Sequence, residues 1–96
     1  MSSRTPEECV ELAVDTSADP DNREDAIHAL KMANECDELA DLVSNDDIED
    51  QYREQALHSL GTPQCDSTLQ QLVEQQSLDS SLQETAEKLL QKINDN

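Results

Sequence analysis

The chain has 96 residues, a single Tyr, no Phe and no Trp, and its 23 acidic residues against six Lys and Arg give a formal net charge of −17. This length corresponds to one domain, whose core must be built from Leu, Ile, Val and Ala. The negative charge repels nucleic acid and acidic membranes, which excludes both as partners. No apolar run approaches the roughly 20 residues that cross a bilayer. The polar start also lacks the apolar stretch of a signal peptide, so we expect a cytoplasmic protein.

Six helices are predicted in chain order, and no strand is expected. Thr5-Pro6-Glu7-Glu8 is a capping box with proline at the first helical position and starts the first helix. The other start and stop signals are Asp19-Pro20, Asn34, Asn45-Asp46-Asp47, a left-handed Gly61 followed by Thr62-Pro63, and Asp79-Ser80-Ser81. The predicted helices cover residues 6–15, 21–33, 35–44, 47–60, 64–76 and 80–93.

The sequence repeats itself with a period of 30 residues, as the alignment of Arg23–Leu30, Arg53–Leu60 and Gln83–Leu90 shows. Apolar residues recur at the same step. Their columns are Cys9/Leu39/Leu69, Leu12/Leu42/Leu72, Ala13/Val43/Val73, Ala26/Ala56/Ala86 and Leu30/Leu60/Leu90. Spacings of three and four residues within each unit are typical of amphipathic helices. The pattern predicts three helical hairpins, at about 5–33, 34–61 and 62–93, within a single domain covering 1–96.

The motif Arg-x-x-Ala-x-x-x-Leu after an Asp-rich turn resembles the short HEAT-like repeats of the phycobilisome-lyase type, and the resemblance covers residues 6–93. It implies an all-α, right-handed α-α superhelix (α-solenoid), whose second helices line a concave side used for protein contacts. Gln83 and Glu87 depart from the motif, so we interpret the third unit as a terminal cap. The related deoxyhypusine hydroxylases hold iron with His-Glu dyads. Glu24-Asp25 and Glu54-Gln55 stand at the matching positions here, so that activity is not expected.

Arg23 and Arg53 occupy the same repeat position, near the start of a predicted second helix and beside acid-rich turns. Stacking of the units would bring each arginine toward carboxylates of the neighbouring unit. We therefore expect a series of partly exposed ion pairs, each contributing about 0 to 1 kcal/mol, that sets the register between units.

Cys9, Cys36 and Cys65 are an odd number of cysteines in a chain without an export signal, which favours reduced thiols over disulfides. Cys9 shares a column with two leucines and is expected in the core. Cys36 and Cys65 lie near helix starts, where a thiol pKa can fall. Neither has a neighbouring His or a Cys-x-x-Cys spacing, so we expect no catalytic or metal role.

His28 and His58 share a repeat position, and each follows a glutamate by four residues, Glu24 and Glu54. On a helix this spacing places carboxylate and imidazole on one face, where they form a weak pair. We interpret the two pairs as a solvated helix face. A metal site built from both pairs is the alternative.

The acidic charge has two explanations, and we favour the environmental one, a surface adapted to concentrated salt as in a halophile. The other is a functional acidic face that binds a basic protein or imitates DNA. Residues 1–60 hold a net charge of −13 and residues 61–96 only −4. The last unit is therefore the least repulsive place for a partner or a second copy.

The sequence favours a non-enzymatic scaffold without a cofactor or metal, acting as a monomer or weak homodimer that binds another protein along its second helices. The residues expected to make that contact are Asp25, His28, Met32, Gln55, His58 and Lys88. The alternatives are an acidic electrostatic binder or DNA mimic, and a metal-binding protein that uses the Glu-x-x-x-His pairs.

Overall fold

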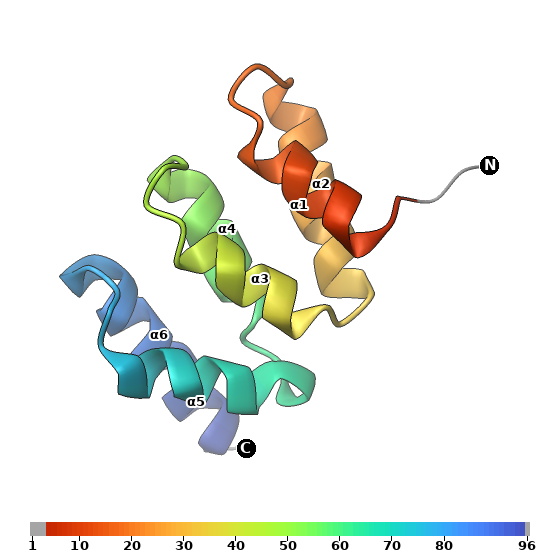
Figure 1. Ribbon diagram of the computed structural model, residues 1–96. Coiled ribbons are helices and arrows are strands. Elements are labelled where there is room, and N and C mark those ends of the chain that lie inside the picture. The colour runs from red at the N-terminus through yellow and green to blue at the C-terminus, as the bar shows by residue number, and fades with distance from the viewer. Residues whose placement is uncertain (1–3, 96) are drawn as a thin grey trace.

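The computed structural model describes residues 4–95; Met1–Ser3 and Asn96, which belong to the predicted domain, lie outside this range. The described residues form six α-helices and one 3-10 turn and contain no strand (Figure 1). The elements are α1 (Pro6–Val14), α2 (Pro20–Met32), α3 (Cys36–Val43), α4 (Asp50–Ser59), η1 (Pro63–Cys65), α5 (Asp66–Gln75) and α6 (Ser80–Asn94). The predicted all-α class and the six predicted helices are confirmed.

Consecutive helices pack together as three pairs: pair 1 (α1 and α2), pair 2 (α3 and α4) and pair 3 (α5 and α6). Helix α3 contacts both α1 and α5, and α4 contacts both α2 and α6. As Figure 1 shows, the first helices form one layer and the second helices lie behind them. Each pair therefore touches the next, and we call the two contacts interface 1–2 and interface 2–3.

The core lies between the two layers and follows the predicted columns. Leu42 and Leu72 are buried and Leu12 is partly buried, so the column expected to be apolar does turn inward. Cys9 is buried among them, as predicted. Ile27 and Leu57 are completely buried, whereas Glu87 at the equivalent position of the last pair is exposed. A charged residue there suits a helix that has no further pair packed on it.

Local signals place most helix ends correctly. Thr5 and Glu8 form the predicted capping box, with Glu8 N donating to Thr5 Oγ1 at 3.2 Å and Thr5 N to Glu8 Oε1 at 2.9 Å. Asp79 caps α6 by accepting a hydrogen bond from Leu82 N at 3.0 Å. Asn34 adopts a left-handed φ of 56° just after α2, as expected of a helix-ending residue.

Two predicted signals are wrong. Helix α4 begins at Asp50 rather than 47, because Asn45 accepts a hydrogen bond from Asp47 N at 2.8 Å and holds this segment in a loop. Gly61 does not have a positive φ. A Cβ atom there would lie 3.1 Å from Leu89 Cδ2 and 3.2 Å from His58 O, so close approach of α6 explains the glycine.

Candidate protein-binding surface

The residues predicted to bind a partner lie on the second-helix layer. Asp25, His28, His58 and Lys88 are exposed, and Met32 is 69% exposed, which makes it the one large apolar side chain left in water within residues 4–95. Gln55 is half-buried and its amide donates to Glu24 O of the neighbouring helix at 3.1 Å. Gln55 therefore links α4 to α2 and presents less of itself to a partner than its neighbours do.

The exposed side of this layer repeats one chemistry three times. Acidic residues form the column Glu24/Glu54/Glu84, and basic or titratable residues form the column His28/His58/Lys88, four residues further along each helix. Lys88 Nζ lies 3.0 Å from Glu84 Oε1, and both side chains are mostly exposed. Exposed pairs of this kind add little to stability. Their side chains therefore remain available to a partner.

Arg23 points inward rather than outward, where it contacts both the first helix of its own pair and residues of pair 2. Its side chain is buried, and its Nε donates to Ala13 O at 2.9 Å. Its two Nη atoms donate to the carboxylate oxygens of Glu49 at 3.0 and 3.1 Å, a bidentate ion pair between pairs 1 and 2. The guanidinium also lies 4.1 Å above the centroid of the Tyr52 ring.

The same position in the other pairs makes the same carbonyl contact. Arg53 Nε donates to Val43 O, and Gln83 Nε2 donates to Val73 O, each at 2.9 Å. Arg53 Nη1 lies 3.8 Å from Asp79 Oδ2 of pair 3. The predicted contact of each arginine with an acid of the next unit is confirmed. The pairs are partly exposed as expected, since the side chains of Glu49 and Asp79 are 50% and 53% exposed. The arginines themselves are buried, and each reaches a carbonyl ten residues earlier in the chain.

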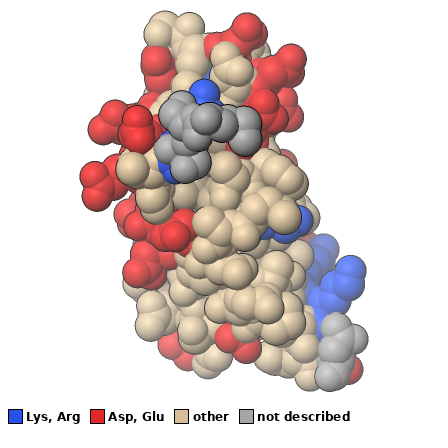
Figure 2. Space-filling model, turned by 90° about the vertical axis from the view of Figure 1, so that its right-hand side faces the viewer, with Lys and Arg blue, Asp and Glu red and all other residues tan. Residues whose placement is uncertain are grey.

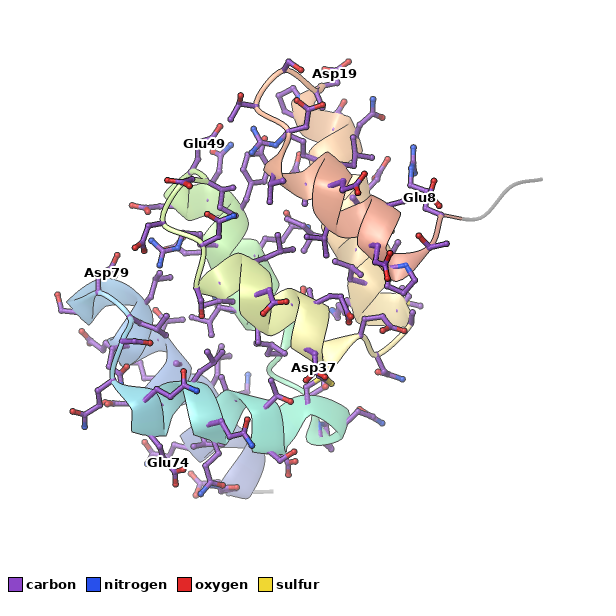
Figure 3. The ribbon with its side chains drawn as sticks, in the orientation of Figure 1. Glu8, Asp19, Asp37, Glu49, Glu74 and Asp79 are labelled. Atoms are coloured by element: carbon purple, nitrogen blue, oxygen red, sulfur yellow. A yellow bond between two sulfur atoms is a disulfide. The ribbon has the colours of Figure 1, made fainter. Side chains whose placement is uncertain are left out.

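Glu49 and Asp79, which pair with the two arginines, lie along one edge of the stack together with Asp19. Figure 3 shows Asp19, Glu49 and Asp79 in succession, each at the loop that precedes a second helix. Hydrogen bonds from Arg23, and the positive charge of its guanidinium, hold the pKa of Glu49 below its usual value. At the other edge, desolvation and the nearby acids Glu38 and Asp37 raise the pKa of Glu35.

Cys36 and Cys65 form a disulfide, which corrects the expectation of reduced thiols for this pair; their Cα atoms are 5.5 Å apart. The two positions are 29 residues apart, one less than the repeat period, so stacking of pair 3 on pair 2 places them side by side. The odd number of cysteines is accounted for by Cys9, which is free and buried. This near match to the repeat period is the feature of the sequence that could have predicted the disulfide.

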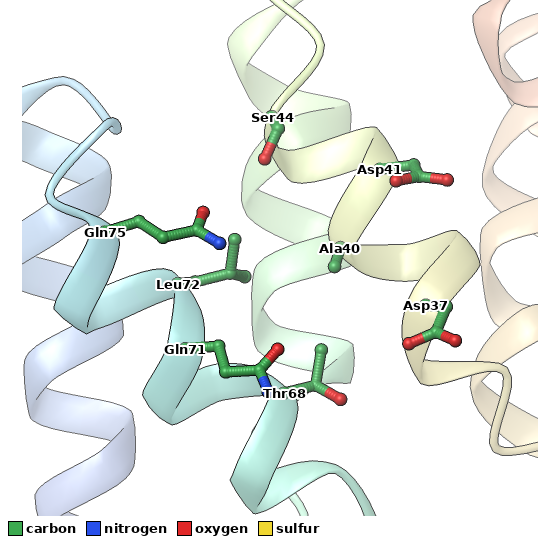
Figure 4. Close-up of a pocket in the computed structure, with 8 residues that line it drawn as sticks. All are labelled: Asp37, Ala40, Asp41, Ser44, Thr68, Gln71, Leu72 and Gln75. Atoms are coloured by element: carbon green, nitrogen blue, oxygen red, sulfur yellow. The ribbon is translucent and has the colours of Figure 1, made fainter.

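A groove of about 220 Å³ runs between α3 and α5. In Figure 4, Ala40 of α3 and Ser44, directly after this helix, face Leu72 and Gln75 of α5, while the carboxylate of Asp41 is turned away from α5. The remaining lining residues are Asp37, Thr68 and Gln71. At the positions of α1 equivalent to Ala40 and Ser44 stand Val10 and Val14, which pack against the core. The smaller side chains therefore account for the groove.

Charge is unevenly spread over the molecule. Figure 2 shows acidic side chains gathered at the upper and left parts of one face, whereas its centre is largely uncharged. This view agrees with the sequence, in which residues 1–60 hold a net charge of −13 and residues 61–96 only −4. A hollow of about 180 Å³ is lined by Gly61, Pro63, Leu89, Lys92 and Ile93 of the less acidic part. The less acidic part of the surface thus lies toward the last pair.

Two further findings concern residues 4–95. No three His, Cys, Asp or Glu side chains in this range gather closely enough to hold a metal ion. None of its helices combines the length and the apolarity of a bilayer-spanning segment. Comparison of the chain with protein-family models, curated proteins and solved structures gave no significant match.

Proposed function

We propose that this chain is a non-enzymatic HEAT-like repeat protein, wound as a right-handed superhelix, that binds another protein along its second helices. The observation that supports this most is the pair of exposed columns on α2, α4 and α6. At each step of the stack an acid is followed four residues later by His, His or Lys. The core and the inter-pair hydrogen bonds do not use the side chains of these columns, and Glu84 and Lys88 pair only with each other within α6.

The size of this surface suits a protein better than a small molecule. Packed helices lie about 8 to 10 Å apart, so three of them present a strip about 20 Å wide. The strip is polar and mixed in charge, with Met32 as an apolar contact at one end. Polar and charged residues are typical of the rim of a protein interface, and Met is among the residues enriched in interfaces.

The proposal is tested by affinity capture from the native cells at their own salt concentration, using two variants of equal size and equal net charge. The test variant is Asp25→Ser/His58→Ser/Lys88→Ser, which changes the second-helix strip. The control variant is Arg4→Ser/Glu11→Ser/Gln70→Ser, which changes exposed residues outside that strip. Both remove one acid, one base and one further polar side chain.

We expect one partner to be retained by the wild type and by the control variant, and to be lost by the test variant. Loss from both variants, or capture of nothing above background, would contradict the proposal. Reversible melting of both variants within a few degrees of the wild type serves as the folding control.

For the acidic surface we propose adaptation to concentrated salt. Carboxylate repulsion is screened there, since the Debye length falls to about 3 Å at 1 M salt. Helix content measured by circular dichroism should rise steeply with added potassium chloride. Full helicity in dilute buffer would instead favour the alternative of an acidic binder for basic proteins, whose binding should disappear as the salt concentration is raised.

A further inference from the structure

The Cys36–Cys65 disulfide cross-links pairs 2 and 3 at interface 2–3. Within residues 4–95, interface 1–2 has no equivalent bond. Cys36 is the first residue of α3, and Cys65 is the last residue of η1, directly before α5. The bond therefore ties the start of one first helix to the start of the next. It also lies next to the α3–α5 groove, since Asp37 and Thr68, which line that groove, are one and three residues beyond the two cysteines.

Non-covalent contacts at interface 2–3 are weaker than those at interface 1–2. Arg53 stays 3.8 Å from Asp79, whereas Arg23 makes two bonds of 3.0 and 3.1 Å to Glu49. Thr85, which occupies the position of Gln55, donates to Ser81 O of its own helix instead of bridging to α4. The α3–α5 groove further reduces the packing of pair 3 on pair 2.

We propose that Cys36–Cys65 is a redox-sensitive cross-link that keeps pair 3 docked on pair 2. In the oxidised protein the bond compensates for the weak contacts of interface 2–3. Reduction by a dithiol removes it, and pair 3 then detaches locally while pairs 1 and 2 stay packed. Local opening exposes apolar side chains of pair 3 that are otherwise buried, such as Leu69 and Leu82. This inference does not depend on the proposed second-helix binding surface.

The reduction is an ordinary thiol–disulfide exchange. A thiolate of the dithiol attacks Cys36 Sγ, which is the more accessible sulfur because Cys36 is half-buried and Cys65 is buried. The S–S bond breaks, Cys65 leaves as a thiolate and takes up a proton, and a mixed disulfide forms on Cys36. The second thiolate of the reductant displaces Cys36, which is also protonated. Two electrons and two protons have then passed to the protein, and the dithiol has become a disulfide.

The test is native-state hydrogen exchange of the full chain, followed by mass spectrometry, in the oxidised form and in excess dithiothreitol. The salt concentration is one at which the oxidised protein is fully helical. We expect amides of α5 and α6 to exchange at least tenfold faster after reduction, since pair 3 then loses the cross-link that holds it on pair 2. Amides of α1 and α2 should change less than twofold. Unchanged exchange in α5 and α6, or equal acceleration in all six helices, would overturn the proposal.

Two variants make the test specific. Cys36→Ser/Cys65→Ser should show the reduced pattern with and without dithiothreitol; a sensitivity to dithiothreitol that persists in this variant contradicts the proposal. Ala40→Val/Ser44→Val fills the groove with the residues that the chain uses at positions 10 and 14. In the reduced state this variant should slow exchange in α5 by at least tenfold relative to the reduced wild type. If it does not, weak packing at interface 2–3 is not the reason for detachment.

Discussion

Interfaces 1–2 and 2–3 join equivalent surfaces of the stack, yet they are stabilised by different means. At interface 1–2, Arg23 combines a carbonyl hydrogen bond, a bidentate ion pair with Glu49 and a position above the Tyr52 ring. At interface 2–3, Arg53 keeps the carbonyl bond but reaches Asp79 only at 3.8 Å, and a disulfide is added. The comparison shows that one repeat motif can be held together by polar contacts or by a covalent bond.

A single methylene group explains much of the difference between the two ion pairs. Glu49 makes no side-chain cap to α4, so both of its oxygens are free to meet the guanidinium of Arg23. Asp79 is shorter, and its Oδ1 accepts a hydrogen bond from Leu82 N at the start of α6. Only Oδ2 then faces Arg53. Capping a helix and pairing with an arginine thus compete for one short side chain.

The largest difference between the interfaces is expected from replacing each arginine by glutamine. Gln83 shows that a glutamine in this column still reaches its carbonyl at 2.9 Å, so the substitution keeps that bond. It removes the ion pair with Glu49 and the Tyr52 contact at position 23, and the pairs with Asp46, Asp50 and Asp79 at position 53. Arg23→Gln should lower the free energy of unfolding by about 2 kcal/mol and Arg53→Gln by about 1 kcal/mol, since hydrogen bonds to charged groups contribute about 1.5 to 3 kcal/mol. Urea unfolding measures both. Equal losses would show that the two arginines stabilise the protein equally and would contradict the prediction.

The next effect concerns the packing between first helices. Val10→Ala/Val14→Ser gives α1 the residues that α3 has at positions 40 and 44, and should open a groove at interface 1–2. Both valines are half-buried, so we expect the free energy of unfolding to fall by about 1 to 2 kcal/mol because less apolar area is buried. The melting temperature checks this, with Gln51→Ala/Gln91→Ser, two exposed and uncharged helix positions, as the control of equal net charge. A loss no larger than that of the control would mean that the valines do not fill this space.

A smaller effect is the pH dependence of the Arg23–Glu49 pair. Because Arg23 lowers the pKa of Glu49 in the folded state, the pair stabilises the protein above the usual pKa of glutamate, 4.5. That contribution is lost as the pH falls through the lowered folded-state pKa. The stability difference between the wild type and Glu49→Gln should therefore be present at about pH 6 and shrink toward zero at about pH 3. A difference that stays constant over this range would show that the carboxylate charge is not responsible.

The smallest effect is expected for Asp79→Asn. Asparagine caps a helix as well as aspartate does, so the bond to Leu82 N should survive while the charge facing Arg53 is lost. We expect a change below about 0.5 kcal/mol, as is typical of half-exposed pairs. Chemical unfolding in the oxidised state measures it. A loss as large as that of Glu49→Gln in the same buffer would remove the distinction between the two interfaces.

Much of the fold was predictable because the signals for helices are local. Thr5 and Asp79 cap helices in the way their side chains suggest, and the columns of Leu and Ala are buried or partly buried as the period of 30 predicts. The loop at Asn45 was misread because an Asn or Asp can close a turn or cap a helix with similar hydrogen bonds. The inward path of Arg23 was missed, although the ten-residue distance from arginine or glutamine to the accepting carbonyl recurs in all three pairs.

The candidate binding surface follows from the sequence only in part. The exposed positions of His28, His58 and Lys88 agree with their place opposite the apolar columns. The involvement of Gln55 in a bond to Glu24 O was not predictable, since it depends on how closely α2 and α4 approach. The disulfide was missed because the cysteines were judged by their odd number rather than by their spacing of nearly one repeat.

The sequence by itself determined that the chain forms six helices, where most of them begin and end, and which apolar residues share a column. These depend on capping and on apolar spacing, which act within a few residues. Only the tertiary structure decided that Arg23 and Arg53 are buried, that Cys36 meets Cys65, and that a groove separates α3 from α5. Those outcomes depend on the distance between helices, which is set by the combined volumes of the side chains that two pairs bring together. The equivalent positions of pairs 1 and 2, for example, hold two valines in one case and Ala40 and Ser44 in the other.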